Sequence, residues 1–496
     1  MKRTLLYLSR LNAVIALAIL PLSLAAPPAS GADSDVIQAK VAQYLKKPGI
    51  RATTWGIEVV DPSTHEVLLS VNPEKPFLPA SVLKVVTTAA ALEKLGPDFR
   101  FRTGAYTNGT LTEDGTLDGD LYLYGRGDPN LTDPEGLLLE KPALQQLAEK
   151  LEALGIRKIE GDIIGDDSYF DTRRHGQGWT AKDLRSFYGA PISALSHGNN
   201  IVWVHARATK PGQAVRVSIE PATAYYSVRN LAVTSQAKSK RTIHARVTPG
   251  TKRLAVSGVL PASQGYSQYL VIERPAEFTA ALLREELKRK GIAVKGSARE
   301  VHYGTYSEEV RSAWTLLVEH QSSPLIRALE IINKKSENLH AEMLLRVLGA
   351  EFRGLGTDEA GLQVVRDFLV EAQVDDEKVS LRDGSGLSRE NLLTPHFQTS
   401  LLLALSKRPY FDLFINTLAI SGVDGTLKNR MSARDVKGVI YAKTGTLNGV
   451  ATLSGYMTTR SGRSLIFSIF ANNARTSMTR IRKAIDEICS LLVSLY

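Results

Sequence analysis

Apolar and polar residues alternate in two short runs near the start of the chain, at residues 53–61 and 66–71, on either side of Pro62-Ser63-Thr64. Alternation with a period of two, interrupted by turn residues, predicts a β-hairpin. An apolar, alanine-rich run from Val82 to Leu95 follows and stops at Gly96-Pro97. Because Gly and Pro mark the ends of helices, we expect this run to form a helix.

The pattern changes after Gly96. Short strand-like runs separated by Gly, Pro and Asn continue to about residue 275, with one helical pattern among them. Helices then dominate before the chain closes with apolar strands and an amphipathic helix. The expected elements of this second half are helices at 277–290, 324–374 and 475–495 and strands at 293–303, 438–443, 450–457 and 464–471.

Three short strings whose side chains could take part in a reaction occur in order along the chain: Ser81-Val-Leu-Lys84, Ser336-Glu-Asn338 and Lys443-Thr444-Gly445. Ser81 opens the expected helix, where the field of the helix N-terminus is positive. Lys84 lies three residues further on, so the two side chains share a helix face. Together the strings can supply a serine nucleophile, a lysine base, a proton relay and a cation for a carboxylate.

Each string also has an ordinary structural interpretation. Ser336 and Asn338 suit a helix start, and the Lys443 string suits a strand end. A second Ser-x-x-Lys occurs at Ser235 to Lys238, but it lies in a polar, charged stretch with no apolar helix after it. We interpret that second copy as a solvated loop.

The distance along the chain between Ser81 and Ser336 predicts an insertion. Two groups of one small site can be this far apart only if the chain between them forms its own domain. We therefore expect residues 33–97 to pack against residues 304–496, with residues 98–303 as an inserted, mostly β region.

The first 32 residues are interpreted as a removable export signal. They combine a basic start, an apolar core and small residues suited to cleavage, at Lys2, Arg3 and Arg10, at 13–24, and at Ala25, Ala26 or Ala32. A membrane anchor is the alternative, but Pro21 interrupts the core and the run is short for a span of about 20 residues. We expect a protein of the periplasm, or of the cell-wall side in a Gram-positive organism, with no membrane anchor after cleavage.

Charge and composition narrow the choice of partners. The net charge is +10, and the expected signal holds three cations and no acid, so its removal leaves +7. This charge favours anionic envelope polymers, although scattered Lys and Arg also fit an unspecific basic surface. There is no nucleic-acid motif. Cys489 is the one cysteine, so no intramolecular disulfide can form, and the nine His include no His-Glu-x-x-His pair. We expect neither a metal nor a cofactor.

The ordered triple resembles that of the class C low-molecular-mass penicillin-binding proteins, which are D-alanyl-D-alanine carboxypeptidases and endopeptidases. Glu337 departs from the Asp typical of the second string. Further stretches similar to this family are 125–131, 198–200, 382–389 and 421–426. The resemblance implies an α+β fold in which helices flank an antiparallel sheet, as in serine β-lactamases. It also implies a nested subdomain at about 171–267 within the inserted region.

The resemblance also implies roles for residues. Ser81 would attack the D-Ala-D-Ala peptide bond of peptidoglycan stem peptides and would be acylated by β-lactams, with Lys84 as its base. Ser336 would pass a proton to the leaving amine and Asn338 would hold Lys84 and the substrate. Lys443 and Thr444 would bind the terminal carboxylate of the substrate, and the backbone N–H groups of Ser81 and Thr446 would form the oxyanion hole. Gly445 would also contact the substrate. Asp166, or its neighbour Asp167, and Arg389 would meet the far end of the substrate.

Two other functions remain open from the residues. A class A-like β-lactamase would use the same serine and lysine, but no Glu-x-x-Leu-Asn string supplies its deacylating glutamate. A non-catalytic β-lactam- or muropeptide-binding protein would usually lack one catalytic group, and none is missing. The balance of carboxypeptidase and endopeptidase activity, the diamino acid of the stem peptide and the oligomeric state stay undecided.

Overall fold

The computed structural model describes residues 31–129, 131 and 141–495. The expected export signal lies outside the described residues except for its last two positions, where helix α1 (Gly31–Leu45) begins. No helix among the described residues is both long and apolar enough to cross a membrane.

The two ends of the chain build one antiparallel sheet, in the order β18-β19-β20-β21-β1-β2. The N-terminal hairpin, β1 (Thr54–Val60) and β2 (Val67–Val71), is present as predicted, and β1 pairs along its whole length with β21 (Ser464–Asn472). The other strands are β18 (Ala419–Ile420), β19 (Ile440–Leu447) and β20 (Val450–Thr458). We call this unit, residues 31–97 and 325–495, the main part.

Helices cover both faces of this sheet, so its strands are buried on both sides. Alternate residues of β21 face opposite ways: Phe467 and Ile469 pack with α1 and α11 (Met478–Leu495), whereas Ile466 and Phe470 pack with the helices of the other face. Helices on that face are α2 (Lys84–Leu95), α6 (Leu325–Glu330), α7 (Asn338–Arg353), α8 (Asp358–Glu371), α9 (Pro395–Ser406) and α10 (Phe411–Asn416). The predicted α+β class is confirmed.

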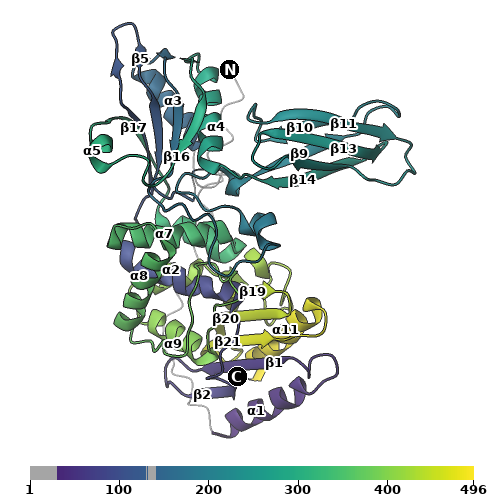
Figure 1. Ribbon diagram of the computed structural model, residues 1–496. Coiled ribbons are helices and arrows are strands. Elements are labelled where there is room, and N and C mark those ends of the chain that lie inside the picture. The colour runs from purple at the N-terminus through teal and green to yellow at the C-terminus, as the bar shows by residue number, and fades with distance from the viewer. Residues whose placement is uncertain (1–30, 130, 132–140, 496) are drawn as a thin grey trace, which may run out of the picture.

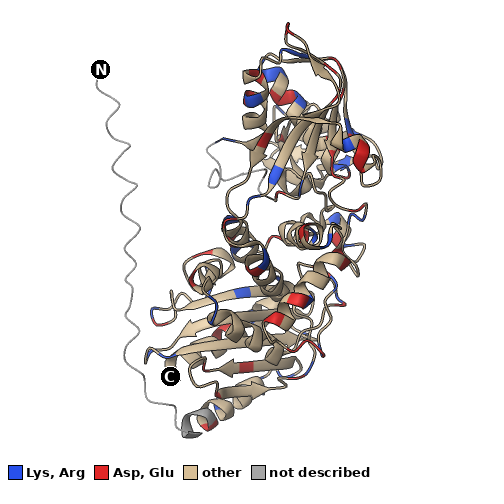
Figure 2. Ribbon diagram, turned by 90° about the vertical axis from the view of Figure 1, so that its left-hand side faces the viewer, with Lys and Arg blue, Asp and Glu red and all other residues tan. Residues whose placement is uncertain are grey.

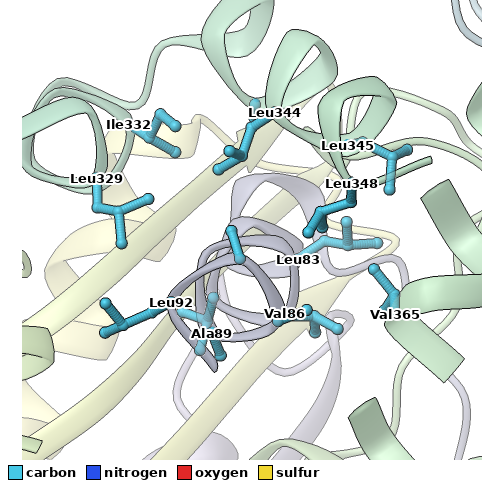
Figure 3. Close-up of a cluster of buried hydrophobic side chains, with 14 of the residues drawn as sticks. Leu83, Val86, Ala89, Leu92, Leu329, Ile332, Leu344, Leu345, Leu348 and Val365 are labelled. Carbon is cyan, nitrogen blue, oxygen red and sulfur yellow. The ribbon is translucent and has the colours of Figure 1, made fainter. Parts of the chain in front are cut away.

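Helix α2 is buried almost all round, which fits its apolar, alanine-rich sequence. Figure 3 shows Val86, Ala89 and Leu92 of this helix, with Leu83 just before it, enclosed by residues of α6, α7 and α8. The predicted helix differs at its start, because residues Ala80–Leu83 form a 3₁₀ turn and the α-helix begins only at Lys84. In a 3₁₀ turn residues i and i+3 eclipse each other, so Lys84 lies directly over Ser81.

The inserted part, residues 98–324, has a five-stranded sheet in the order β16-β8-β6-β3-β17. Its strands are β3 (Arg102–Thr107), β6 (Leu121–Gly125), β8 (Ile163–Asp166), β16 (Ala298–Val301) and β17 (Thr315–Gln321), and helices α3 (Ala143–Ala153) and α4 (Pro275–Arg289) pack with it. A smaller sheet joins β4 (Thr110–Leu111), β5 (Thr116–Asp118), β7 (Lys158–Ile159) and β15 (Ala293–Val294). The short helix α5 (Glu308–Ser312) precedes β17.

The expected return to the main part at residue 304 is placed too early. Strand β17 pairs antiparallel with β3 from Gln321 opposite Arg102 to Thr315 opposite Thr107. The inserted sheet therefore takes its last strand from residues that we had expected to belong to the main part. Pairing between strands that are distant in the chain cannot be recognised from the local sequence pattern. The predicted boundary at residue 304 therefore follows the change from strand-like to helical patterns and not the strand pairing.

A nested pair of sheets projects from the side of the inserted part (Figure 1). One sheet holds β9 (Ile201–Arg207), β10 (Arg216–Glu220) and β14 (Gly265–Val271), and the other β11 (Ser227–Ser235), β12 (His244–Val247) and β13 (Arg253–Pro261). These sheets extend to Val271, slightly past the expected end at 267. A linking segment with short 3₁₀ turns, residues 171–200, precedes them.

One buried arginine fastens this linking segment to the main part. The side chain of Arg346 on α7 is fully buried; its Nε donates to Asp358 (2.7 Å) and its Nη1 to the Asp171 carboxylate (3.0 Å) and the Arg173 carbonyl (2.6 Å). This link between Arg346 and the linking segment bears on the residues singled out in the sequence, because α7, which carries Arg346, begins at Asn338.

Over the rest of the molecule, charges of both signs are interspersed on the main part and on the inserted part (Figure 2).

Replacing Arg346 by Ala is expected to lower the free energy of unfolding by about 3–5 kcal/mol, because the buried Asp358 carboxylate would lose its cation. Urea denaturation followed by tryptophan fluorescence measures this. Arg353→Ala is the matched control: Arg353 lies on the same helix, and its ion pair with Asp367 is exposed, so the loss should stay below about 1 kcal/mol. Equal losses in the two variants would contradict the assigned role.

Candidate active site

The structure brings the three strings together at the junction of α2, α7 and β19. The Nζ of Lys84 lies 2.9 Å from the Ser81 Oγ and 2.6 Å from the Asn338 Oδ1. The Nζ of Lys443 lies 2.8 Å from the Ser336 Oγ. Segments far apart in the chain thus meet through two direct lysine contacts.

The turn before Ser81 is held against strand β19. Thr452 on β20 donates its hydroxyl to the Pro79 carbonyl (2.8 Å), and Ala80 adopts a left-handed conformation (φ 47°) that is costly for a residue with a Cβ. A Cβ on Gly445 would lie 2.1 Å from the Thr452 Oγ1 and 2.8 Å from the Pro79 carbonyl oxygen. Gly445 therefore permits the close approach of the strand to the turn that carries Ser81.

Lys84 is buried, and three oxygen atoms surround its Nζ: those of Ser81, Asn338 and the Ser385 carbonyl, the last at 2.7 Å. The Asn338 amide is oriented by its own Nδ2, which donates to the Tyr188 carbonyl (2.9 Å). A carbonyl and an amide oxygen can only accept hydrogen bonds. A neutral amine would donate its two hydrogens to these two atoms, which leaves its lone pair facing the Ser81 hydroxyl.

Burial lowers the pKa of Lys84 to about 8, even though the nearby carboxyl groups of Glu342, Asp383 and Glu337 act in the opposite direction. Desolvation disfavours the charged ammonium form, which explains the direction of the shift. About one molecule in ten therefore carries a neutral Lys84 at pH 7. The geometry and the protonation state agree that this amine can accept a proton from Ser81.

Ser336 and Lys443 form the second pair. Ser336 has a left-handed backbone (φ 65°) directly after a π-helical turn, Ile331–Lys335, and this turns its hydroxyl toward Lys443. The Lys443 Nζ also donates to the Thr444 carbonyl (2.9 Å), and burial, together with the Lys84 charge, lowers the pKa of Lys443 well below its ordinary value. The Thr444 hydroxyl lies 2.8 Å from that of Thr426.

Two residues that the sequence interpretation missed shape the surroundings of Lys84. The buried Glu342 carboxyl group, whose pKa burial and the nearby Asp383 raise to about 8, accepts hydrogen bonds from the backbone N–H groups of Gly384 (3.0 Å) and Ser385 (2.8 Å). These bonds set the loop whose carbonyl receives Lys84. Tyr188, from the linking segment, supplies the carbonyl that orients Asn338. Both contacts use the backbone of one partner, so no side-chain motif signals them.

A cleft of about 760 Å³ opens in front of Ser81. Of the predicted residues, Ser81, Ser336, Asn338, Thr446 and Arg389 line it, whereas Lys443, Thr444 and Gly445 lie behind its wall. Its other lining residues come from the linking segment and from loops of the main part, and include Thr180, Lys182, Asp183, Phe187, Tyr188, Lys335, Glu337 and Asn448. Arg389 Nη2 donates to the Asn448 carbonyl (3.0 Å) at the rim.

The structure does not place Asp166 at this cleft. Asp166 ends strand β8, which lies between β16 and β6, and its side chain is fully buried, with Oδ1 accepting from the Ser168 N–H (2.8 Å). Asp167 is also buried, in contact with Arg174 (2.5 Å), His302 (2.8 Å) and Ser193 (2.7 Å). The acid of the inserted part that does line the cleft is Asp183, whose Oδ2 accepts from Thr180.

Nothing among the described residues groups three or more His, Cys, Asp or Glu side chains in a way that could hold a metal ion. The groups in direct contact at the serine–lysine centre are the hydroxyls of Ser81 and Ser336, the amines of Lys84 and Lys443 and the amide of Asn338. This set is typical of acyl transfer through a serine nucleophile.

Comparison with known proteins agrees with this chemistry. The model of the D-Ala-D-Ala carboxypeptidase 3 (S13) family matches residues 37–492. The chain is 35% identical over 480 residues to a D-alanyl-D-alanine carboxypeptidase of an Actinomadura species, covering 93% of this chain and 87% of the relative. It is 30% identical over 421 residues to the D-alanyl-D-alanine carboxypeptidase DacB of Haemophilus influenzae, covering 83% and 84%.

Solved structures extend the agreement to the fold. The crystal structure of penicillin binding protein 4 (dacB) from Haemophilus influenzae superimposes with a TM-score of 0.77 at 26% identity, covering 92% of this chain and 99% of that one. A second crystal structure of that protein, with a β-lactam bound, has a TM-score of 0.72. On these matches, together with the geometry around Ser81, the chain belongs to the D-Ala-D-Ala carboxypeptidase 3 family of serine peptidases.

Proposed function

We propose that Ser81 is the nucleophile with which this enzyme hydrolyses the terminal D-Ala-D-Ala bond of peptidoglycan stem peptides. The observation that carries this proposal is the 2.9 Å contact between the Ser81 hydroxyl and a buried lysine whose other two neighbours can only accept hydrogen bonds. The family membership supports the substrate class.

Acylation begins with a proton transfer. Neutral Lys84 takes the Ser81 proton while Oγ attacks the carbonyl carbon of the penultimate D-Ala. The tetrahedral oxygen carries the negative charge, and the backbone N–H groups of Ser81 and Thr446 stabilise it, since both residues line the cleft. The adjoining wall with Ser336 and Thr446 receives the terminal carboxylate, whose negative charge favours the protonated form of the buried Lys443 behind it.

The leaving amine then needs a proton. Ser336 lies at the cleft wall in contact with Lys443, so it can pass a proton outward to the departing D-Ala nitrogen and recover one from Lys443. The C–N bond breaks, and the Ser81 ester remains. Lys84 then releases the proton that it took from Ser81, which replaces the one that Lys443 gave up. The neutral amine takes a proton from the water that attacks the ester and returns it to the Ser81 Oγ as the ester bond breaks. The same steps release a cross-linked D-centre in place of free D-Ala, which would make the enzyme a D,D-endopeptidase as well.

β-Lactams enter the same chemistry as covalent inhibitors. Their strained amide occupies the place of the D-Ala-D-Ala bond, and the Ser81 ester that forms retains the rest of the molecule in the cleft. A crystal structure of the Haemophilus relative with a β-lactam supports this binding mode. The expected export signal and the envelope substrate together favour the periplasm, or the cell-wall side in a Gram-positive organism.

Asp183 takes the substrate-recognition role that the sequence interpretation gave to Asp166. It comes from the inserted part, lines the cleft and is partly exposed, as a carboxylate that meets a charged ligand must be. The free ammonium group of a diaminopimelate-type stem peptide would pair with it. Arg389, which also lines the cleft, would meet a carboxylate of the same side arm.

Benzylpenicillin is expected to form one stable adduct, seen by intact-protein mass spectrometry, that is lost in Ser81→Ala. Ser235→Ala is the matched control, because it removes the serine of the second Ser-x-x-Lys string, and it should retain the adduct. An adduct that survives in Ser81→Ala would overturn the assignment of the nucleophile.

The rate of penicillin acylation should rise with pH and level off near pH 8. The folded-state pKa of Lys84 is lowered to about 8, and only the neutral amine can act as the base, so each pH unit below that value lowers its reactive fraction about tenfold. Stopped-flow acylation between pH 5.5 and 9.5 tests this. A rate independent of pH over that range would argue against Lys84 as the base.

Asp183→Asn should lower kcat/KM for stem peptides with a free side-chain ammonium several-fold, because a partly exposed charge pair is worth about 1 kcal/mol. Acylation by benzylpenicillin, which has no ammonium group, should hardly change. Asp166→Asn serves as the control and should leave the ratio of the two rates unaltered. The role would return to Asp166 if only that variant discriminated between the two substrates.

A further inference from the structure

A row of aromatic rings leads out of the active-site cleft onto the nested sheet. Phe187 lines the cleft and is 49% exposed; its ring meets that of Tyr269 edge to face, with centroids 5.5 Å apart. Tyr269 in turn meets Trp203 edge to face at 5.9 Å, and Trp203 is 41% exposed. The His205 ring continues the row, nearly parallel to the indole at 6.4 Å.

The register of the strands explains why these residues share one face. Along β9 the burial alternates: Val202, Val204 and Ala206 are buried, whereas Trp203 and Arg207 are exposed. Trp203 lies opposite Tyr269 of β14 and Glu220 of β10, and the next two rows on this face hold Ser267, His205 and Ser218, and then Gly265, Arg207 and Arg216. We call the outward-facing residues of these three rows, together with Phe187, the nested face.

The nested face is not needed for the core of its own subdomain. The opposite side of the same sheet packs with the second sheet through Val202 and Val204 against residues such as Leu254 and Val256. This is the usual arrangement of a two-sheet sandwich, in which one face of each sheet is buried. Large rings on the outer face keep apolar surface in contact with water, a cost that points to a binding partner.

The chemistry of the nested face alternates between flat apolar rings and polar groups. His205 bridges the strands, with Nδ1 2.8 Å from the Ser267 hydroxyl and Nε2 3.0 Å from the Glu220 carboxylate. Arg207 and Arg216 end the row with donors. A pyranose sugar presents a complementary pattern, because its C–H groups form an apolar face that stacks on aromatic rings while its hydroxyl and acetamido groups hydrogen-bond at the edge.

We propose that the nested face binds a glycan strand of peptidoglycan, and thereby presents the attached stem peptides to Ser81. This inference rests on the proposed function, because the stem peptide that enters the cleft is covalently joined to such a strand. The continuity of the two surfaces argues for this ligand, because Phe187 belongs both to the cleft and to the row of rings. A single peptidoglycan molecule could therefore lie with its glycan strand on the nested face and its stem peptide in the cleft.

The test compares the double variant Trp203→Ala/Tyr269→Ala with the unaltered enzyme and with Tyr303→Ala. Tyr303 is a matched control because it is a single exposed aromatic residue, at 54%, after strand β16. The probe is peptide-free glycan strands, prepared from peptidoglycan by removing the stem peptides, and binding is measured by microscale thermophoresis. Each ring removed should weaken binding about three- to tenfold, while Tyr303→Ala should bind normally.

Kinetics separates this inference from the proposed function. In the double variant KM for polymeric peptidoglycan should rise while kcat stays unchanged, and hydrolysis of a soluble pentapeptide and acylation by benzylpenicillin should match those of the unaltered enzyme. Absence of pentapeptide hydrolysis in the unaltered enzyme would instead refute the proposed function.

Three outcomes would overturn the glycan inference. They are undiminished glycan binding by the double variant, no glycan binding by the unaltered enzyme, and a change from dimer to monomer in the double variant by analytical ultracentrifugation. The last would assign the nested face to a second copy of this chain.

Discussion

The burial of the Lys84 amine is the constraint on which the rest of the site depends. An ammonium group without water must find acceptors in the protein, and here they come from α7 and from the loop at Ser385, while the Ser81 hydroxyl takes the third direction. The same burial lowers the pKa of Lys84, which makes the amine a base. The arrangement of the site and its reactivity therefore both depend on the burial of this one nitrogen atom.

Each acceptor of Lys84 has its own support further out. Glu342 fixes the backbone that carries the Ser385 carbonyl, and the Tyr188 carbonyl of the linking segment orients the Asn338 amide. Arg346, on the helix that Asn338 begins, binds Asp171 of that same segment. The inserted part thus contributes to the geometry of the serine–lysine pair as well as to the wall of the cleft.

Local patterns predicted the hairpin, the buried helix and the three strings, because alternation, helix ends and i, i+3 spacing are properties of short segments. They could not distinguish Asp166 from Asp183, since the exposure of an acid depends on which strands flank it. Likewise the pairing of β17 with β3, and the backbone contacts of Glu342 and Tyr188, arise only when distant segments meet.

The pairing of β1 with β21 sets an order of events as the chain folds. These two strands form neighbours in one sheet although nearly the whole chain separates them, and contacts of such long range form slowly. As the chain is synthesised, the N-terminal hairpin must therefore wait, with one edge unpaired, until the last strands appear. The inserted part, whose strands all lie between, can fold first and bring the two ends together, so the insertion would act as an internal scaffold for assembling the site.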